Sequence, residues 1–390
     1  MKKTGIITMY YKSCNYGGLL QSYALINFIK KIGFESEQIC RPHVYNENLQ
    51  RPIPVKVSLL RLFLRKSKNQ TIKLIRWLIL NFVSNKLLLR KEKLEEFEKS
   101  IPHSESIYTR ENISDTIDKY DCFITGSDQV WNMSWYNKEY FLDFVPKTKQ
   151  KISYAASMPN INLTNIEKET IYKHLLSFDD ISTREENTAS FLSDLIGREV
   201  KHVLDPTLLL DAKDWDKTAT EYNIEEKYIF CYFLGNDRAY RNIVKRFAKT
   251  LGLKIATFPH LNQVKLNDVG FGDYRIYDAG PAEFVYLIKN AEYVFTDSFH
   301  ATVFSNLYSV KHYVFSRTGE KMDSRITDLL RMFDNENRFL NVELESVDDY
   351  IFKLKDADVF PKNALYEQKK EFSQNYLKKN LDKEKINNEN

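Results

Sequence analysis

The feature that most constrains the fold is a repeated alternation of short apolar runs with segments of helical periodicity. Near the start, "TGIITMYY" is followed by a glycine loop and by "LLQSYALINFIKKIG", in which Leu25, Phe28 and Ile29 share one helical face. The second half repeats this order with "KYIFCYFLGN" and "RNIVKRFAKTLG". The alternation predicts an α/β protein with two Rossmann-like domains that face each other across a cleft.

Chain length sets the expected division. The 390 residues exceed one typical hydrophobic core and suit two domains. The proline in "VKHVLDPTLLL" marks a boundary near residues 205–214. We therefore predict an N-terminal domain over 1–205 with a helical insert at about 51–101, a C-terminal domain over 206–345, and a helical tail over 346–390.

Cysteine usage and hydropathy exclude several classes. The four cysteines are widely spaced, without a CxxC pair or a Cys/His cluster, so we expect free thiols and no metal site. The N-terminal apolar run is short and is typical of a first strand, not of a signal peptide. No run of 18 apolar residues occurs, so we expect no membrane-spanning helix and a cytoplasmic location.

The segment 51–91 concentrates positive charge. It carries eleven lysines and arginines and no acid, whereas the net charge of the whole chain is only +4. Apolar and aromatic residues such as Phe63 and Trp77 fill the gaps between the cations. The pattern fits two structures: a packed helix with a solvated basic face, or a segment in peripheral contact with an anionic membrane. Nucleic acid is disfavoured, because the rest of the chain is not basic and no recognition motif occurs.

Polar residues follow two of the expected strands in the first half. Asn15, Tyr16 and Gly17 follow the first strand, and "GSDQVWN" follows "DCFIT". In parallel α/β sheets ligands bind at the carboxyl ends of strands. Asp128 and Gln129 would offer polar edges, with an aromatic face beside them, which suits a sugar. The alternative is a tight glycine turn and an ordinary helix cap. The glycines do not form GxGxxG, so a dinucleotide site is disfavoured.

Two further stretches suggest an anion site. Arg184 in "STREEN" lies at the end of a short predicted strand. Its side chain would either form a surface ion pair or bind an anionic ligand. In "TDSFHATVFSN", Ser298 is well placed to cap a helix, and His300 falls in its first turn. A helix N-terminus attracts phosphate or carboxylate, and a histidine beside a bound phosphate is a useful acid/base. The alternative is a helix cap followed by a core histidine.

Seven stretches together carry a family resemblance. They are "NYGGLLQSYAL", "DCFITGSDQVWN", "SYAASM", "STREEN", "VLDPTLLL", "GPAEFVYLIKNAEYVFTDSFHATVFS" and "SRITDLL". In this order, from about residue 5 to residue 330, the chain resembles the polysaccharide pyruvyl transferase family of bacterial exopolysaccharide and capsule biosynthesis. The resemblance implies a GT-B-like fold and transfer of pyruvate from phosphoenolpyruvate to a sugar of a polysaccharide precursor, as a ketal. It implies no metal or nucleotide cofactor.

The resemblance also implies site residues. Arg184 matches an arginine that serves donor binding, and His300 matches the histidine of an Arg-x-His element. Ser298 stands where that element has its arginine, so Arg325, or Arg317 and Lys321 before it, would supply the second cation. Asp297 would orient the histidine or bind a hydroxyl. The acceptor would contact residues of the first domain: Asn15, Tyr16, Gly17, Asp128, Gln129 and Trp131.

Partners follow from the same resemblance, and two other functions stay open. We expect phosphoenolpyruvate as donor and a glycan acceptor, lipid-linked at the inner face of the membrane, with peripheral contact through residues 51–91. A nucleotide-sugar glycosyltransferase on the same architecture is the first alternative, and it would need an acid such as Glu283 or Asp297 for the ribose. The second alternative is a non-catalytic binding protein.

Overall fold

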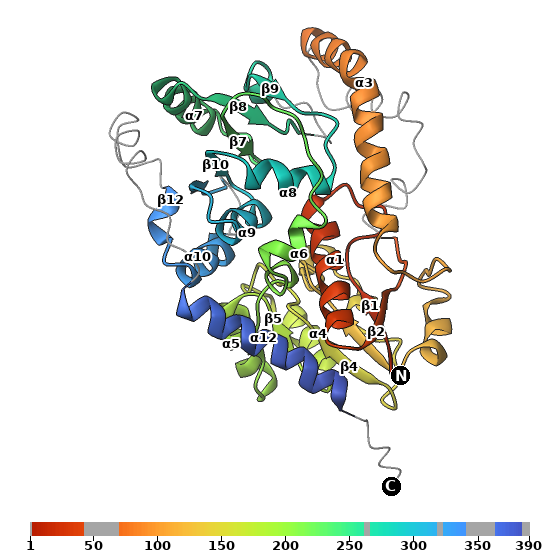
Figure 1. Ribbon diagram of the computed structural model, residues 1–390. Helices are drawn as coiled ribbons and strands as arrows, with labels where there is room; N and C mark the ends of the chain where they lie inside the picture. The colour runs from red at the N-terminus through yellow and green to blue at the C-terminus, as the bar shows by residue number, and fades with distance from the viewer. Residues whose placement is uncertain (1, 43–69, 261–265, 318–322, 341–362, 384–390) are drawn as a thin grey trace. The chain divides into compact units, whose positions relative to one another are not determined.

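The computed structural model describes residues 2–42, 70–260, 266–317, 323–340 and 363–383 (Figure 1). The chain forms two compact units. Unit 1 comprises Met1–Tyr45, Phe97–Asp211 and Asn363–Asn390, and unit 2 comprises Asn46–Glu96 and Ala212–Lys362. The main boundary between the two units in the chain falls at Asp211, inside the region where the sequence places the domain boundary.

Unit 1 is built on a parallel sheet in the order β2-β1-β3-β4. The strands are β1 (Lys3–Ile7), β2 (Glu35–Gln38), β3 (Cys122–Thr125) and β4 (Gln150–Ser153). All residues of β3 and β4 are buried, as expected for parallel strands covered on both faces. The pair β5 (Ser182–Thr183) and β6 (Lys201–His202) extends this arrangement through a parallel bridge from Ala156 to Thr183. The strand order reverses between β1 and β3, which makes their carboxyl ends a switch point.

Most of the described helices of unit 1 begin at a polar residue whose side chain caps the helix. The helices are α1 (Tyr16–Lys31), α4 (Asn165–Leu175), α5 (Glu186–Ile196) and α12 (Ala364–Asp382), with short 3-10 turns η1 (Ile113–Lys119), η2 (Met133–Trp135), η3 (Lys138–Phe141) and η4 (Pro206–Leu208). The C-terminal helix α12 belongs to this unit and is not a separate tail. Its Tyr376 hydroxyl donates to the Ser153 carbonyl at 2.9 Å, and Gln150 donates to the Asn380 carbonyl at 2.8 Å.

Unit 2 contains a parallel sheet in the order β12-β11-β10-β7-β8-β9. The strands are β7 (Tyr228–Tyr232), β8 (Lys254–Thr257), β9 (Tyr274–Arg275), β10 (Tyr293–Thr296), β11 (His312–Phe315) and β12 (Phe339–Leu340). Taken in chain order, this is the Rossmann arrangement, and the order reverses between β7 and β10. The carboxyl ends of these two strands are therefore the switch point of unit 2.

Helices of unit 2 follow the strands. They are α6 (Ala212–Asp216), α7 (Arg238–Leu251), α8 (Pro281–Lys289), α9 (Phe299–Leu307) and α10 (Asp323–Met332), with 3-10 turns η5 (Leu266–Asp268) and η6 (Glu336–Arg338). Phe247 of α7 packs on Phe295 of β10, with ring centroids 5.2 Å apart, in the main apolar cluster. Gly252 ends α7 with φ +67°, a left-handed conformation that glycine adopts without a steric penalty.

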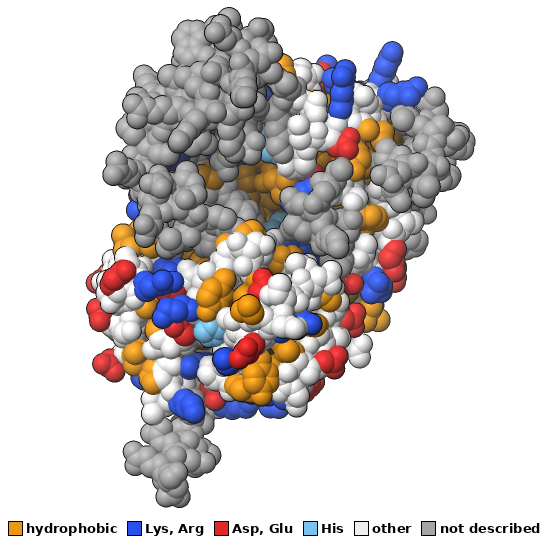
Figure 2. Space-filling view, turned by 180° about the vertical axis from the view of Figure 1, so that it is seen from behind, with side chains coloured by type: hydrophobic (Ala, Val, Ile, Leu, Met, Phe, Trp, Pro, Cys, Tyr) orange, Lys and Arg blue, Asp and Glu red, His pale blue; other side chains and the backbone are white. Residues whose placement is uncertain are grey.

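The insert includes a long helix, α3 (Gln70–Lys99) (Figure 1). Lys86 pairs with Asp278 at 3.4 Å, and the buried Arg90 guanidinium lies 5.2 Å from the Phe258 ring. The insert was predicted within the first domain; residues 46–96 group with unit 2 instead. On the face shown in Figure 2, the described basic and acidic side chains are interspersed and form no single basic patch. The first part of the segment, residues 51–69, lies outside the described residues.

Candidate functional site

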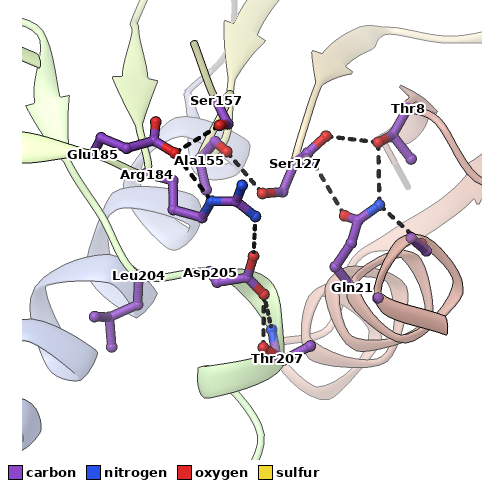
Figure 3. Close-up of polar contacts among 12 residues, drawn as sticks. Thr8, Gln21, Ser127, Ala155, Ser157, Arg184, Glu185, Leu204, Asp205 and Thr207 are labelled. Carbon is purple, nitrogen blue, oxygen red and sulfur yellow. Dashed lines mark hydrogen bonds and ion pairs between the residues drawn. The ribbon is translucent and has the colours of Figure 1, made fainter. Parts of the chain in front are cut away.

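Residues from five of the motifs meet at the carboxyl ends of the strands in unit 1 (Figure 3). Thr8, directly beyond β1, donates its hydroxyl to the Ser127 carbonyl at 2.7 Å. The Ser127 hydroxyl donates to the Ala155 carbonyl at 2.7 Å, which joins the loops after β3 and β4. Gln21 of α1 donates to Thr8 at 3.2 Å and accepts from the Ser127 N–H at 3.2 Å. Segments far apart in sequence therefore form one buried hydrogen-bond network.

Arg184 lies inside this network and not on the surface. Its side chain is 2% exposed, and it donates to Asp205 at 2.8 Å and to Glu185 at 3.4 Å. Ser157 donates to the same Glu185 oxygen at 2.6 Å. Burial alone would lower the pKa of Arg184, but the carboxylates of Glu185, Asp205 and Asp128 raise it above its ordinary value. The guanidinium is thus a charged cross-link between two internal carboxylates, and any anionic ligand would compete with them.

Trp131 does not offer an aromatic face to a ligand. It is 1% exposed, its ring stacks on Phe141 with centroids 5.6 Å apart and planes 7° apart, and its N–H donates to the Tyr140 carbonyl at 3.2 Å. The prediction that Trp131 forms a sugar platform is therefore wrong, because a core position satisfies both its ring and its polar atom. Gln129, in the same loop, is half-buried and accepts from Asn132 at 3.1 Å.

The start of α1 has the structure that the alternative prediction describes, a tight glycine turn with an ordinary helix cap. Asn15 is exposed and caps the helix, accepting from the Gly17 N–H at 3.0 Å, while Tyr16 is 1% exposed. A Cβ at Gly18 would lie 2.9 Å from the Met9 carbonyl oxygen. Glycine is required there because the helix packs directly on the loop after β1. Of these residues, Asn15 is the one whose side chain reaches the surface.

In unit 2 the switch point is occupied by Asp297. Its carboxylate is 1% exposed and accepts from the N–H groups of Leu234 and Gly235, at 2.7 and 2.6 Å. Arg317 donates to the Asp297 carbonyl at 3.0 Å and lies 3.9 Å from its carboxylate. Both carboxylate oxygens therefore join the loop after β7 to the loop after β10. This contact accounts for the burial of Asp297 without a role in orienting His300.

The start of α9 has the predicted cap. Ser298 has φ −101° and accepts from the Ala301 N–H at 3.5 Å, and His300 is half-buried in the first turn. The Arg325 guanidinium lies 5.7 Å from the ring of Phe299, the first residue of α9. Two arginines, Arg325 and Arg317, therefore lie near the residues that open this helix. Lys321, the third candidate cation, lies outside the described residues.

Glu283 does not remain available for a nucleotide ribose. It accepts from the Gly280 N–H at 2.9 Å as part of the cap of α8, and it also pairs with Lys93 of α3. A cap and an ion pair together satisfy this carboxylate. The observation removes one of the two candidates for the single acid that the nucleotide-sugar alternative would need.

Sequence reasoning missed a polar cluster that shapes the loop after β7. Buried Arg241 donates to Asp268 at 3.0 Å and to the Gly235 carbonyl at 3.3 Å. His260 contacts Asp268 at 2.9 Å and the Leu234 carbonyl at 2.7 Å. Burial raises the pKa of Asp268, but His260 and Arg241 hold it below its ordinary value. No local pattern connects these residues, because only the tertiary fold brings them together.

Neither a metal-binding cluster nor a membrane-spanning helix occurs among the residues that the structure describes. Within residues 2–42, 70–260, 266–317, 323–340 and 363–383, no group of three or more His, Cys, Asp or Glu side chains could hold a metal ion. Over the same part of the chain, no helix is long and apolar enough to cross a membrane.

Comparison with solved structures defines the class of protein. The S. aureus protein MnaA, solved with UDP, matches with a TM-score of 0.52 and 12% identity over 99% of both chains. The UDP-GlcNAc 2-epimerase of Methanocaldococcus jannaschii matches with a TM-score of 0.52 and 12% identity over 97% of this chain and 99% of that one. At these identities the likeness shows the fold alone: two Rossmann-like domains of the GT-B type, as predicted.

A family model identifies the chain more closely. The model of the polysaccharide pyruvyl transferase family matches residues 15–319, so the protein belongs to that family. A comparison with curated protein sequences gave no match. The switch point of unit 2 lies within the matched residues, as does the loop after β3 in unit 1.

Proposed function

We propose that this protein transfers pyruvate from phosphoenolpyruvate to a sugar of a cell-surface polysaccharide precursor, where it forms a ketal. Membership in the family makes the protein a polysaccharide pyruvyl transferase. The observation that carries the donor assignment is the placement of His300 in the first turn of α9, with Arg317 and Arg325 near that helix start. Phosphoenolpyruvate carries a phosphate and a carboxylate, and both anions favour arginines and a helix N-terminus.

Ketal formation needs an acid for the donor. The methylene carbon of phosphoenolpyruvate must gain a proton, after which C2 is cationic and can accept an oxygen. We assign this proton donation to His300, the titratable side chain in the first turn of α9. Phosphate then leaves when the second sugar hydroxyl bonds to C2. The reaction written in this way uses no redox step and no nucleotide cofactor.

The acceptor is assigned to the switch point of unit 1. Asn15 and Gln129 reach or approach the surface there, and Asp128 follows β3 directly. Arg184 keeps a supporting role in this proposal, since its guanidinium is engaged by Asp205 and Glu185. Its predicted contact with the donor is not retained as part of the proposal.

We also propose that the basic segment, residues 51–91, contacts a membrane. Within the described end of the basic segment, Lys86 pairs with Asp278, Arg90 is buried, and Lys91 pairs with Glu95 at 3.2 Å. These three cations are therefore engaged with the protein itself. We propose that the earlier part of the segment makes the reversible contact, and that it binds the cytoplasmic face of the membrane that carries the lipid-linked acceptor.

A direct assay tests the proposed function. The protein is incubated with phosphoenolpyruvate and a panel of glycosides, and both phosphate release and product mass are followed. We expect acceptor-dependent phosphate release and a mass gain equal to pyruvate less water. Thermal shift with phosphoenolpyruvate, UDP and GDP provides the comparison with the nucleotide-sugar class. Stabilisation by UDP or GDP together with no response to phosphoenolpyruvate would contradict the proposal.

A further inference from the structure

Arg41 and Glu139 form a buried ion pair in unit 1. Arg41 follows β2, and Glu139 belongs to the turn η3. The Arg41 Nη2 atom lies 3.2 Å from the Glu139 Oε2 atom, and both side chains are 2% exposed. The other carboxylate oxygen of Glu139 accepts from Arg110 at 2.8 Å. Because Arg110 is 62% exposed, the pair is reached from the surface of the unit along this side chain.

The pair is held where the strands of unit 1 end. The Cys40 thiol lies 3.4 Å from the Tyr10 hydroxyl, which joins the residue before Arg41 to the loop after β1. Thr125, the last residue of β3, donates its hydroxyl to the Tyr140 carbonyl at 2.7 Å. The Arg41 guanidinium lies 5.5 Å from the centre of the Tyr140 ring. Arg41 is therefore connected to the segments that follow β1 and β3, the two strands of the switch point.

The pair retains hydrogen-bonding capacity that the protein itself does not use. Among the residues that the structure describes, the buried Nε and Nη1 atoms of Arg41 have no hydrogen-bond partner, and neither has the Glu139 Oε2 atom. Burial of a polar atom without a partner costs free energy, and such atoms are rare in folded proteins. A pair that served only to cross-link two loops would be expected to satisfy these atoms internally. The unused donors and the unused acceptor therefore point to a ligand.

The unused atoms also indicate what kind of ligand fits. Burial acts to raise the pKa of Glu139, but Arg110 and Arg41 hold that pKa below its ordinary value. The ionised carboxylate can only accept hydrogen bonds, whereas the guanidinium can only donate them. A hydroxyl group both donates and accepts, so neighbouring hydroxyls of a sugar ring can satisfy both side chains. A phosphate or carboxylate would satisfy Arg41 but would lie against the negative charge of Glu139.

We propose that Arg41 and Glu139 bind neighbouring hydroxyl groups of the acceptor sugar, with Arg41 donating to a sugar oxygen and Glu139 accepting from a sugar hydroxyl. The inference rests on the proposed function and deepens its acceptor side, within unit 1 alone. The pair binds and orients the sugar and takes no part in making or breaking bonds. This subsite should prefer two neutral hydroxyls to a phosphate or a carboxylate.

Direct binding tests the proposal apart from the transfer reaction. Methyl glycosides of glucose, galactose, mannose and N-acetylglucosamine are titrated into the full chain without phosphoenolpyruvate, and binding is followed by saturation-transfer NMR and calorimetry. Arg41→Lys keeps a cation beside Glu139 but lacks the guanidinium fork, and Glu139→Gln keeps the shape but loses the charge and one acceptor. Each variant should raise the Kd of the bound glycoside roughly 10–100-fold, the value of a lost charge-assisted hydrogen bond. Lys138→Met is the matched control, because Lys138 lies in the same turn but pairs with Asp143 at 2.8 Å, and its Kd should equal that of wild type.

Deoxy analogues of the bound glycoside give a second readout that does not depend on how a variant folds. Removing either of two neighbouring hydroxyls should raise the wild-type Kd by a similar factor. Arg41→Lys should respond less to the same removal, because the variant has already lost that contact. Independent effects of the two changes, with each removal equally costly in wild type and in Arg41→Lys, would contradict the assignment.

Three other results would overturn the binding role. The first is a Kd within a few fold of wild type in folded Arg41→Lys and Glu139→Gln. The second is tighter binding of a glycosyl phosphate or a methyl glucuronide, weakened by Arg41→Lys while neutral glycosides are unaffected, which would make this an anion site. The third is a wild-type protein that binds none of the glycosides. The proposed function fails separately: wild type that binds glycosides through this pair, but releases no phosphate from phosphoenolpyruvate, keeps the binding pair and loses pyruvyl transfer.

Discussion

Replacing Arg184 distinguishes a structural cross-link from a donor ligand. In the structure its guanidinium contacts Asp205 at 2.8 Å and Glu185 at 3.4 Å, and its side chain is 2% exposed. In Arg184→Ala, Asp205 keeps the Thr207 N–H at 3.0 Å and Glu185 keeps the Ser157 hydroxyl at 2.6 Å, but both buried carboxylates lose their cation. Breaking a buried pair in this way costs about 3–5 kcal/mol of unfolding free energy.

The assay is thermal and urea unfolding of the variant beside donor kinetics. At roughly 2–4 °C per kcal/mol for a domain of this size, the unfolding midpoint should fall by roughly 6–20 °C. Arg110→Ala is the control, because Arg110 is 62% exposed and its partner Glu139 keeps Arg41 at 3.2 Å. Its loss should cost at most about 1 kcal/mol.

The opposite result would restore the role that the sequence suggested for Arg184. If the residue is a donor ligand and little else, Arg184→Ala should raise the KM for phosphoenolpyruvate by roughly 10–100-fold, the value of a lost charge-assisted hydrogen bond. A midpoint shift as small as that of Arg110→Ala, together with such a KM increase, would refute the cross-link. Arg184→Lys should lose part of the stability only, since an ammonium cannot reproduce the planar fork of the guanidinium.

Two further predictions concern pH and the basic segment. Burial lowers the pKa of His312 from 6.5 to about 4, so the unfolded chain binds the proton more readily. The contribution of neutral, buried His312 to the unfolding free energy is fully present above pH 6.5, and the unfolding free energy should fall by about 3 kcal/mol as the pH drops to about 4. Urea unfolding over that pH range measures this fall. An unfolding free energy that does not change with pH, in the wild type and in His312→Gln alike, would contradict the prediction. For residues 51–82 we expect flotation with anionic liposomes at low salt and release at high salt; folded protein that floats with neither anionic nor neutral liposomes at low salt would disprove membrane contact.

The sequence predicted the fold well because its signals are local. Alternating apolar runs and helical periodicity depend on neighbouring residues, so both Rossmann-like units and the division near Asp211 could be anticipated. The cap at Ser298 follows from the same kind of local rule. The grouping of α3 with unit 2 could not be read in this way, because it depends on contacts such as that of Lys86 with Asp278.

The site was predicted only in part, for a related reason. Motif order located both switch points, but it could not say which polar groups are used inside the protein. Trp131 is a core residue, and Asp297 is held by backbone N–H groups of the loop after β7. The burial of Asp128, which is 8% exposed, is likewise evident only in the structure. Long-range contacts decide such assignments.

The central claim is that the start of α9 provides the acid for pyruvyl transfer, and His300→Ala tests it most directly. With an accepted glycoside and saturating phosphoenolpyruvate, the variant should release phosphate and form the ketal product roughly 10²–10⁴-fold more slowly than wild type. His300 is half-buried in the first turn and does not cap the helix, so unfolding should change little. A folded His300→Ala protein that forms product within a few fold of the wild-type rate would contradict the account.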